Sequence, residues 1–163
     1  FFKNHNFEID IEVVEDGINI LDTGGGILNL ISQSSEENFL IFNPDTIWNR
    51  KYFSEIKNMI DLHFEKKFKN TLLLVNKSLS FDKNLDGDFN LRNNIIDKNQ
   101  KNYIYTGCQI LNRSIFQDRF IHSFSMTKIW LDQINNNQLG GFESKNDFYH
   151  ISNLKIFNKL KDL

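Results

Sequence analysis

Three consecutive glycines, and an aspartate further along the chain, are the residues of this sequence best placed to do chemistry. Gly24, Gly25 and Gly26 carry no side chains, so a ligand can lie directly against backbone N–H groups there. We predict that a helix follows from about Gly26 to Ser32, and the start of a helix carries a partial positive charge that favours phosphate groups. The glycines therefore indicate an anion-binding turn, unless they serve only as a flexible turn.

The aspartate, Asp45, follows an apolar run at Phe39–Phe42 and ends the segment Asn43-Pro44-Asp45. A continuous apolar run is typical of a strand that is covered on both faces in a parallel sheet. Ligands of open α/β sheets bind beyond the carboxyl ends of such strands. Asp45 is thus expected in a ligand site, and the alternative is that it caps the helix that follows.

The spacing of the glycines excludes two common nucleotide-binding motifs. A dinucleotide fingerprint requires G-x-G-x-x-G, and a Walker loop requires G-x-x-x-x-G-K-[ST]. Here the three glycines are followed by Ile27 and Leu28, so neither motif is present.

The order of these features resembles that of the sugar-phosphate nucleotidyltransferase family, and within it the N-acetylmuramate-1-phosphate uridylyltransferases and the mannose-1-phosphate guanylyltransferases. In that family an [ED]-T-G-G-G-I segment is followed by a helix and by a strand that ends in N-x-D. Here the same order is formed by Asp22-Thr23-Gly24-Gly25-Gly26-Ile27 and Asn43-Pro44-Asp45. The resemblance extends over essentially the whole chain.

The resemblance implies a fold of the α/β class, the Rossmann-like, three-layer α/β/α nucleotide-diphospho-sugar transferase fold with a mixed, mostly parallel sheet. Residues 1–163 are expected to form a single domain, or the C-terminal part of one. In the family, the first β-α units carry a G-x-G-T-R phosphate-binding loop and a lysine. That loop does not occur in the 163 residues, and the opening Phe1-Phe2-Lys3-Asn4-His5 resembles the tail of a helix. We therefore expect those units to precede Phe1.

The periodicity of the apolar residues predicts the remaining elements. Alternation at Ile9, Ile11 and Val13 predicts a half-covered strand. The other expected elements are a helix with an apolar stripe from Trp48 to Phe64, a buried strand at 71–75, short antiparallel strands within 76–102, a long strand at 103–111, a helix at 127–137, a strand at 138–142 and a terminal helix from Asn153 to about Leu160. His63 has no acidic or cysteine partner at ligand spacing, so we interpret it as structural.

Two further segments resemble family motifs that lie beside the sugar phosphate. Gly87-Asp88-Phe89 matches a G-D-F segment in a hairpin insert, and Tyr105-Thr106-Gly107-Cys108-Gln109-Ile110 matches [FY]-[ST]-G-[IC]-Q-I. The second match implies sugar contacts at Thr106 and Gly107. The alternatives are an ordinary surface meander for the first segment and a simple β-bulge at the glycine for the second.

A third segment departs from the family pattern. Phe148-Tyr149-His150-Ile151-Ser152-Asn153 occupies the place of the family's W-x-D-[IV]-G-T-P. In many relatives that aspartate shares the catalytic magnesium with the aspartate of N-x-D, and His150 stands in its place here. Imidazole is a poor magnesium ligand. His150 is therefore expected to hydrogen-bond a phosphate, a ribose hydroxyl or a metal-bound water, or else to serve in capping or packing.

Carried over residue by residue, the resemblance implies a site with Mg²⁺ as its cofactor. Asp45 is the expected magnesium ligand and catalytic residue. The expected substrate contacts are Thr23, Gly24, Gly25, Gly26, Asn43, Thr106, Gly107 and His150.

The implied reaction transfers a nucleoside monophosphate, most simply UMP, from a nucleoside triphosphate to a sugar 1-phosphate and releases pyrophosphate. It would supply a nucleotide sugar for cell-wall or surface glycan synthesis, including peptidoglycan recycling. The 163 residues by themselves are expected to be inactive without the phosphate loop. Two alternatives are open: a different triphosphate, such as GTP with mannose 1-phosphate or dTTP or CTP with another sugar, and a non-catalytic module that binds nucleotide sugars for regulation.

The composition argues against several other classes of protein. The 19 Lys and Arg residues and the 21 Asp and Glu residues are scattered and leave a formal net charge of -2, so nothing favours nucleic-acid binding. The single cysteine, Cys108, excludes an internal disulfide, fits a reducing cytoplasm, and has apolar neighbours that predict a buried, inert thiol. No apolar run approaches the ~20 residues of a membrane span, and no signal-peptide pattern opens the chain, so we expect a cytoplasmic protein.

Overall fold

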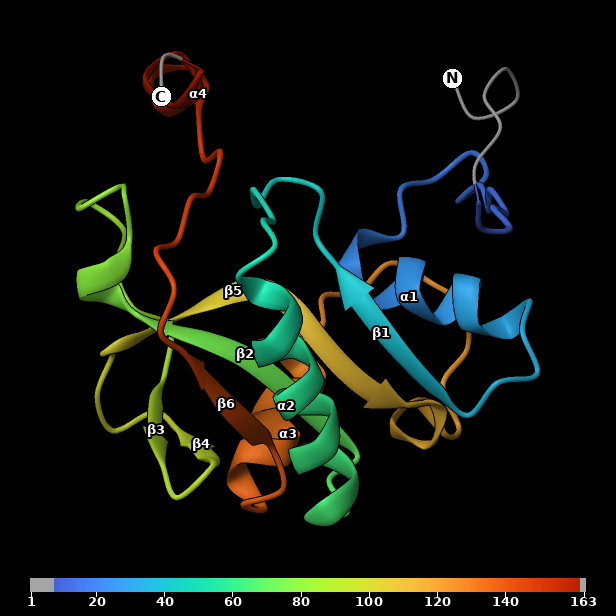
Figure 1. Cartoon of the computed structure of the whole chain (residues 1–163). Coiled ribbons are helices and arrows are strands. Elements are labelled where there is room, and N and C mark those ends of the chain that lie inside the picture. Colours follow the sequence, from blue (N-terminus) through green and yellow to red (C-terminus); the bar gives the residue numbers. More distant parts are fainter. Residues whose placement is uncertain (1–7, 162–163) are drawn as a thin grey trace.

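The computed structural model describes residues 8–161, so the predicted helix tail at residues 1–5 lies outside the described part. The elements, shown in Figure 1, are in chain order α1 (Asp22–Ser32), β1 (Asn38–Phe42), α2 (Tyr52–Glu65), β2 (Asn70–Asn76), the 3₁₀ helix η2 (Lys77–Leu79), β3 (Asn90–Arg92), β4 (Ile95–Asp97), β5 (Tyr103–Asn112), the 3₁₀ helix η3 (Arg113–Phe116), α3 (Thr127–Asn135), β6 (Gly140–Ser144) and α4 (Leu154–Leu160).

The strands form one sheet in the order β1-β5-β2-β6-β4-β3. Strands β2 and β6 are parallel, and the other neighbouring pairs are antiparallel. The α/β fold class is confirmed, but the prediction of a mostly parallel sheet is wrong for the described strands. That prediction rested on long apolar runs, and such runs report only that both faces of a strand are covered. Strand β5 meets this condition while it runs antiparallel to both of its neighbours.

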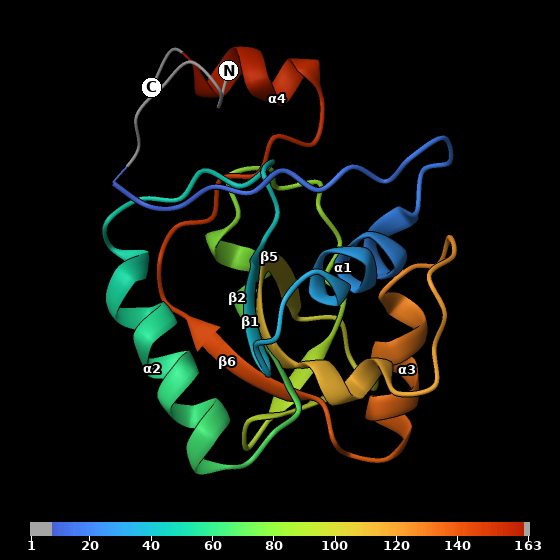
Figure 2. The ribbon, with the colours of Figure 1, turned by 90° about the vertical axis from the view of Figure 1, so that its right-hand side faces the viewer.

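Helices cover both faces of the sheet, so the predicted three layers are present (Figure 2). On one face, α2 packs Met59 against Leu73 of β2. On the other face, Ile31 of α1 and Ile129 of α3 pack with Leu111 of β5. All five side chains are buried, and burial of apolar surface of this kind is the main stabilising contribution to such a fold.

Strand β1 lies at one edge of the sheet. Among the described strands it pairs with β5 alone, and Leu40 and Phe42 keep 38% and 44% of their surface exposed. The strand itself was predicted correctly, but its expected cover on both faces is wrong. An apolar run does not say whether both faces of a strand are covered, because the elements that pack on each face come from distant parts of the chain.

The segment before α1 forms no strand, contrary to the prediction from its alternating pattern. Ile9 and Val13 are 72% and 64% exposed. A strand requires a partner for its backbone N–H and C=O groups, and none of the described strands pairs with residues 8–20. Alternation in the sequence is therefore not sufficient to make this segment part of the sheet.

The three glycines lie inside helix α1 and not before it, because the helix begins at Asp22. The predicted start near Gly26 is wrong for this reason. The N–H groups of Gly24 and Gly25 donate to the carbonyl oxygen of Phe124 at 2.8 and 3.1 Å. A Cβ atom on Gly25 would overlap the carbonyl oxygen of His122. In this structure, two of the glycines thus allow the segment that leads to α3 to lie directly against α1.

Gly25→Ala is expected to lower the free energy of unfolding by about 1–3 kcal/mol, the usual effect of forcing extra volume into a packed contact. Gly26→Ala is the matched control, because its Cβ would lie at an ordinary contact distance, 3.7 Å, from Asp16 Oδ1. Alanine is favoured over glycine within a helix by roughly 0.5–1 kcal/mol, so this variant should be neutral or more stable. Urea unfolding measures both variants, and equal effects would contradict the packing role.

Most other predicted elements are present with shifted bounds. Helix α2 begins at Tyr52, after the predicted Trp48 start. Its stripe buries Tyr52 and Met59 but leaves Phe53 and Phe64 78% and 54% exposed. The predicted strands at 71–75 and 103–111 correspond to β2 and β5, and the predicted antiparallel strands within 76–102 include the β3–β4 pair.

The two residues predicted to be structural are so. His63 is buried, and its Nδ1 lies 3.0 Å from Thr71 Oγ1. Cys108 is a buried free cysteine, and burial raises the pKa of its thiol to about 12. A thiol in this environment is a poor nucleophile at neutral pH because almost none of it is ionised.

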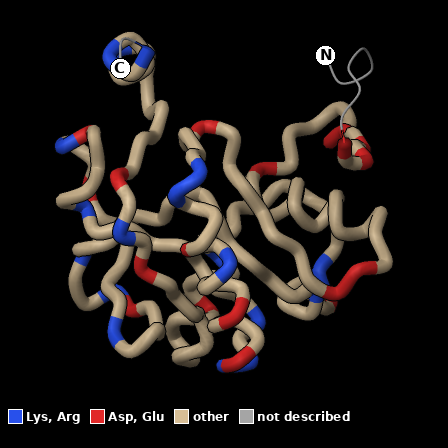
Figure 3. The backbone as a smooth tube through the Cα atoms, viewed as in Figure 1, with Lys and Arg blue, Asp and Glu red and all other residues tan. Residues whose placement is uncertain are grey.

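Charged residues of both signs alternate over the molecule, as Figure 3 shows for the described chain. This distribution agrees with the scattered charges of the sequence. Among the helices of residues 8–161, none combines the length and the apolar character needed to cross a membrane.

Candidate active site

Asp45 and His150, which are far apart in the sequence, form an ion-pair contact just beyond the carboxyl end of β1. His150 Nε2 lies 3.2 Å from Asp45 Oδ2. The histidine donates this hydrogen bond, so in the neutral ring the other nitrogen, Nδ1, is the acceptor. The structure therefore brings together two of the residues that the sequence analysis singled out for the site.

Backbone pairing holds these two residues together. Thr46 and His150 form an antiparallel bridge. The N–H of Ile47 donates to Tyr149 O at 2.9 Å, and the N–H of Ile151 donates to Asp45 O at 2.8 Å. Because these bonds involve only main-chain atoms, the approach of the Asp45 and His150 side chains follows from the path of the backbone.

The His150 ring is also supported from behind. It stacks on the buried ring of Phe148, with centroids 5.9 Å apart and an interplanar angle of 13°. Only 27% of the His150 side chain is exposed, against 47% for Asp45. The imidazole is thus held in one orientation while the carboxylate keeps access to solvent.

Three buried polar atoms around this pair have no hydrogen-bond partner among the described residues. They are Asp45 Oδ1, His150 Nδ1 and the Tyr105 hydroxyl. Burial raises the pKa of the Tyr105 phenol well above its usual value, and the nearby Cys108 thiol and Asp45 carboxylate raise it further. Buried polar groups are normally paired, so this concentration of unpaired atoms indicates a place for a polar ligand.

A pocket of about 370 Å³ opens beside Tyr105. It is lined by Asp88, Phe89, Lys98, Lys101, Tyr105, Thr127 and Trp130. Asp88 Oδ2 accepts a hydrogen bond from the Tyr105 N–H at 2.9 Å. Partial desolvation raises the pKa of Asp88, against the opposing effects of that hydrogen bond, Lys101 and His150. The pocket combines an aromatic wall at Trp130 with acidic, basic and hydroxyl groups.

Asn43 and Gly107 meet at the same end of the sheet. The N–H of Asn43 donates to Gly107 O at 2.8 Å, and a Cβ on Gly107 would lie 2.8 Å from the Cβ of Asn43. Gly107 has a φ of +89°, a conformation that glycine adopts without the strain of a side chain. This glycine is thus required by the close approach of β1 to β5.

Thr106 faces the interior and not the pocket. Its hydroxyl donates to Leu73 O at 2.9 Å, and its own carbonyl accepts a hydrogen bond from Thr46 Oγ1 at 2.7 Å. The residue is fully buried. Its hydroxyl and its carbonyl oxygen are therefore already hydrogen-bonded within the protein.

Thr23 and the glycines contact a different part of the chain. The Thr23 hydroxyl oxygen accepts a hydrogen bond from the Met126 N–H at 3.0 Å, and the first two glycine N–H groups are bonded to Phe124. Of the residues predicted for the site, Asp45 contacts His150 and Asn43 contacts Gly107, while Thr23, Gly24 and Gly25 bond to the segment before α3.

Asp45 is the one side chain of the Asp45–His150 pair that suits a magnesium ion. No group of three or more His, Cys, Asp or Glu side chains able to hold a metal ion occurs among residues 8–161. Asp45 offers Oδ1, an unpaired carboxylate oxygen. Magnesium is commonly held by one or two carboxylates together with water and substrate phosphates, so Asp45 fits such a site, with the remaining ligands coming from water and phosphate.

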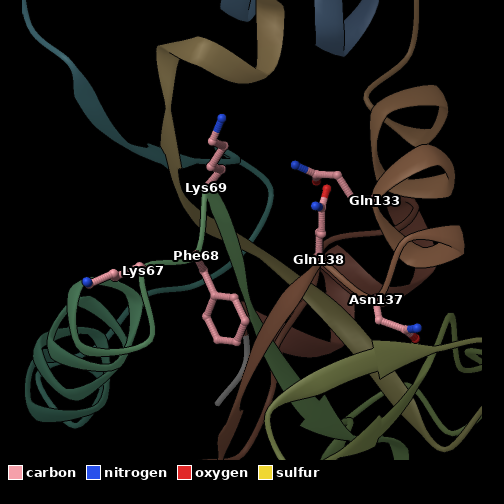
Figure 4. A pocket seen from close by; sticks show the side chains of 6 residues that line it. All are labelled: Lys67, Phe68, Lys69, Gln133, Asn137 and Gln138. Atoms are coloured by element: carbon pink, nitrogen blue, oxygen red, sulfur yellow. The ribbon is translucent and has the colours of Figure 1, made fainter.

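A second pocket, of about 290 Å³, lies at the opposite end of β2 and β6 (Figure 4). It is lined by Lys67, Phe68 and Lys69 from the turn before β2 and by Gln133, Asn137 and Gln138 from the end of α3 and the turn after it. Its lining contains no carboxylate or imidazole, whereas the pocket beside Tyr105 is lined in part by Asp88. The pocket beside Tyr105 is therefore the better candidate for chemistry.

Comparison with known proteins identifies the fold through structure alone. No protein-family model and no curated protein matches the sequence. HddC from Yersinia pseudotuberculosis is similar in structure, with a TM-score of 0.64 and 20% identity over 87% of this chain. The inositol-1-phosphate CTP transferase of T. maritima has a TM-score of 0.64 and 15% identity over 86% of this chain.

UDP-glucose pyrophosphorylase in complex with UDP-glucose is also similar, with a TM-score of 0.63 and 16% identity over 88% of this chain. The chain has the fold of these nucleotidyltransferases. It spans 62% of the length of each of the three solved chains. HddC has also been solved as a complex with GMP-PN. The predicted fold class is thus confirmed, and at this level of identity the likeness establishes the fold alone.

Two site residues were not predicted as such from the sequence. Asp88 lay within the G-D-F segment and Tyr105 within the [FY]-[ST]-G segment, but neither was chosen as a ligand contact. The chosen neighbour, Thr106, is the residue that the alternation of the strand turns inward. Because successive strand residues point to opposite faces, the identity of the pocket-facing residue depended on which face of β5 lies below α3.

Tyr105→Phe is expected to raise the free energy of unfolding by about 1 kcal/mol, since it removes a buried hydroxyl that has no protein partner. Tyr52→Phe is the matched control. The Tyr52 hydroxyl donates to Asp147 O at 3.0 Å, so its removal should lower stability by about 0.5–1.5 kcal/mol. Urea unfolding of both variants gives the comparison, and a loss of stability in Tyr105→Phe would mean that its hydroxyl is hydrogen-bonded in solution.

Proposed function

We propose that the protein containing this chain is a sugar-1-phosphate nucleotidyltransferase that acts most readily with UTP. The observation that carries this proposal is the Asp45–His150 pair beyond the carboxyl end of β1, with unpaired buried atoms on both side chains. The nucleotidyltransferase fold supports it. A protein of this function would work in the cytoplasm and supply UDP-sugars for cell-wall or surface glycans.

In the proposed reaction, an oxygen of the sugar phosphate attacks the α-phosphorus of UTP. The bond from that phosphorus to the bridging oxygen of the β-phosphate breaks, and pyrophosphate leaves with the electron pair. Such a reaction depends chiefly on positioning and on neutralising the phosphate oxygens. A magnesium ion held by Asp45 supplies part of that charge neutralisation when bound. His150, held against Asp45 at 3.2 Å, places a hydrogen-bonding ring beside the phosphates.

The pocket beside Tyr105 is proposed to hold the sugar phosphate. Asp88 and the Tyr105 hydroxyl can hydrogen-bond sugar hydroxyl groups, and Trp130 forms an apolar wall against which a sugar ring can pack. Lys98 and Lys101 line the same pocket and provide positive charge for a phosphate. Asn43 and Gly107, which the resemblance implies as substrate contacts, are proposed here to support this site through their backbone. Thr23 and the glycines are proposed as nucleotide contacts, which requires their hydrogen bonds with Met126 and Phe124 to break.

Two alternatives remain in view. The triphosphate can be GTP with mannose 1-phosphate, or dTTP or CTP with another sugar. A different class of function is a regulatory module that binds a nucleotide sugar without turnover. The observation that favours the module is His150 itself, because it occupies the place where a second carboxylate would ligate magnesium.

The identity of the triphosphate is tested by a panel of UTP, GTP, CTP and dTTP with N-acetylmuramate 1-phosphate and with mannose 1-phosphate. Pyrophosphate release by the native polypeptide that contains these residues is the measurement, and UTP is expected to react fastest. If no triphosphate reacts but calorimetry detects a UDP-sugar bound, the regulatory module is the function. The 163-residue chain alone is expected to release no pyrophosphate, and release would contradict that expectation.

Asp45→Asn is expected to lower kcat by at least about 10²-fold, the usual effect of removing a charge-stabilising group from a reaction centre. Asparagine keeps the shape of the side chain, so the unfolding transition should change little. Asp61→Asn, on an exposed turn of α2, is the matched control and should leave kcat unchanged. Equal turnover of Asp45→Asn and the native protein would remove Asp45 from the metal site.

A further inference from the structure

The segment that leads from β6 to His150 is hydrogen-bonded, where it leaves the sheet, to one side chain of α2. Glu55, in the first turn of α2, accepts three hydrogen bonds from this segment. The donors are Ser144 Oγ, the Lys145 N–H at 2.8 Å and Asn146 Nδ2 at 2.8 Å. Both carboxylate oxygens are used, Oε1 by Lys145 and Oε2 by the other two.

A second side chain from the same turn of α2 is hydrogen-bonded to the next residue of this segment. The Tyr52 hydroxyl donates to Asp147 O at 3.0 Å. Tyr52 and Glu55 are three residues apart, so they lie on the same face of α2. Desolvation of the Tyr52 phenol, with the neighbouring Glu55 carboxylate as the next cause, raises its pKa to about 12, which keeps the hydroxyl a donor at all ordinary pH values.

The residues between Asp147 and His150 are also held by backbone hydrogen bonds. After Asp147, the N–H of Phe148 donates to Leu79 O at 2.9 Å, and Phe148 O accepts from the Phe81 N–H at 2.9 Å. The next residues pair with the segment after β1, as described above. Hydrogen bonds at both ends of residues 144–151 therefore restrict the position of the His150 backbone, and with it the position of the ring.

From these contacts we propose that Glu55 is a positioning residue, which holds the Ser144–Asn146 segment so that His150 is presented to Asp45. Hydrogen bonds to an ionised acceptor are roughly twice as strong as neutral ones, and a carboxylate that accepts three of them cannot be replaced by a neutral amide of the same size. A glutamine at this position keeps one acceptor oxygen and turns an NH₂ group toward donors. The inference rests on the proposed function only for its effect on turnover.

The test is Glu55→Gln, followed by NMR of protein labelled with ¹³C in its four histidines. We expect the Cε1–Hε1 signal of His150, assigned with a His150→Gln variant, to shift or broaden. The signal of His63, which is buried against Thr71 on the same helix, should stay in place. Amide exchange at Lys145 should accelerate by at least about tenfold, because its acceptor is lost.

Glu65→Gln is the matched control, since Glu65 lies at the other end of α2, where its carboxylate contacts the exposed Lys66 Nζ at 3.3 Å. This variant should move neither histidine signal. If Glu55→Gln does not fold, Tyr52→Phe takes its place, because it removes one hydrogen bond from the same segment and leaves the ring in the core. It is expected to shift the His150 signal by less than Glu55→Gln would.

Faster exchange at Lys145 with an unchanged His150 signal would overturn the proposal, and so would unchanged exchange. A movement of both histidine signals would also overturn it, because it would indicate a general loosening of α2. Where the native polypeptide turns over, Glu55→Gln should lower kcat by about tenfold with little change in KM. Absence of nucleotide-sugar binding in the native protein would refute the proposed function, yet the histidine signals would still decide the role of Glu55.

Discussion

The antiparallel pairing of residues 45–47 with residues 149–151 is the contact on which the candidate site depends. It joins the loop after β1 to the segment after β6, and it uses main-chain hydrogen bonds at 2.8 and 2.9 Å. The sheet alone would leave these two loops independent, because β5 and β2 lie between β1 and β6. Asp45 and His150 meet because both loops bend across the end of the sheet toward one another.

Two polar side chains in the centre of the sheet are not available for reaction. Strand β5 lies between β1 and β2, its Thr106 hydroxyl is bonded to Leu73 O, and Cys108 is buried with its pKa near 12. Gly107 then lets Asn43 approach the strand closely. Thr106 and Cys108 are thus satisfied or kept neutral, whereas Tyr105 of the same strand, together with Asp45 and His150 in the loops, carries a buried polar atom without a partner among the described residues.

Several predictions failed for one shared reason, which is that local pattern carries no information about neighbours. The apolar run of β1 was expected to be covered on both faces, and the alternation at residues 9–13 was expected to form a strand. Both outcomes depend on which segments lie alongside. The glycines illustrate the same point, because their lack of side chains suits a phosphate as well as it suits the carbonyl groups of His122 and Phe124. Whether such a glycine contacts a phosphate or another part of the chain depends on which group lies next to it in the folded protein.

The sequence by itself determined the α/β class, most of the elements, the inert character of Cys108 and His63, and the choice of Asp45 and His150 as residues of interest. These follow from local periodicity, residue chemistry and motif order. The tertiary structure decided the direction of the strands, the inward turn of Thr106, the position of Asp88 and Tyr105 beside one pocket, and the hydrogen bonds of Glu55 to the segment before His150. Each of these rests on contacts between residues far apart in the chain, and such contacts are set by the packing of the whole molecule and not by any single stretch of it.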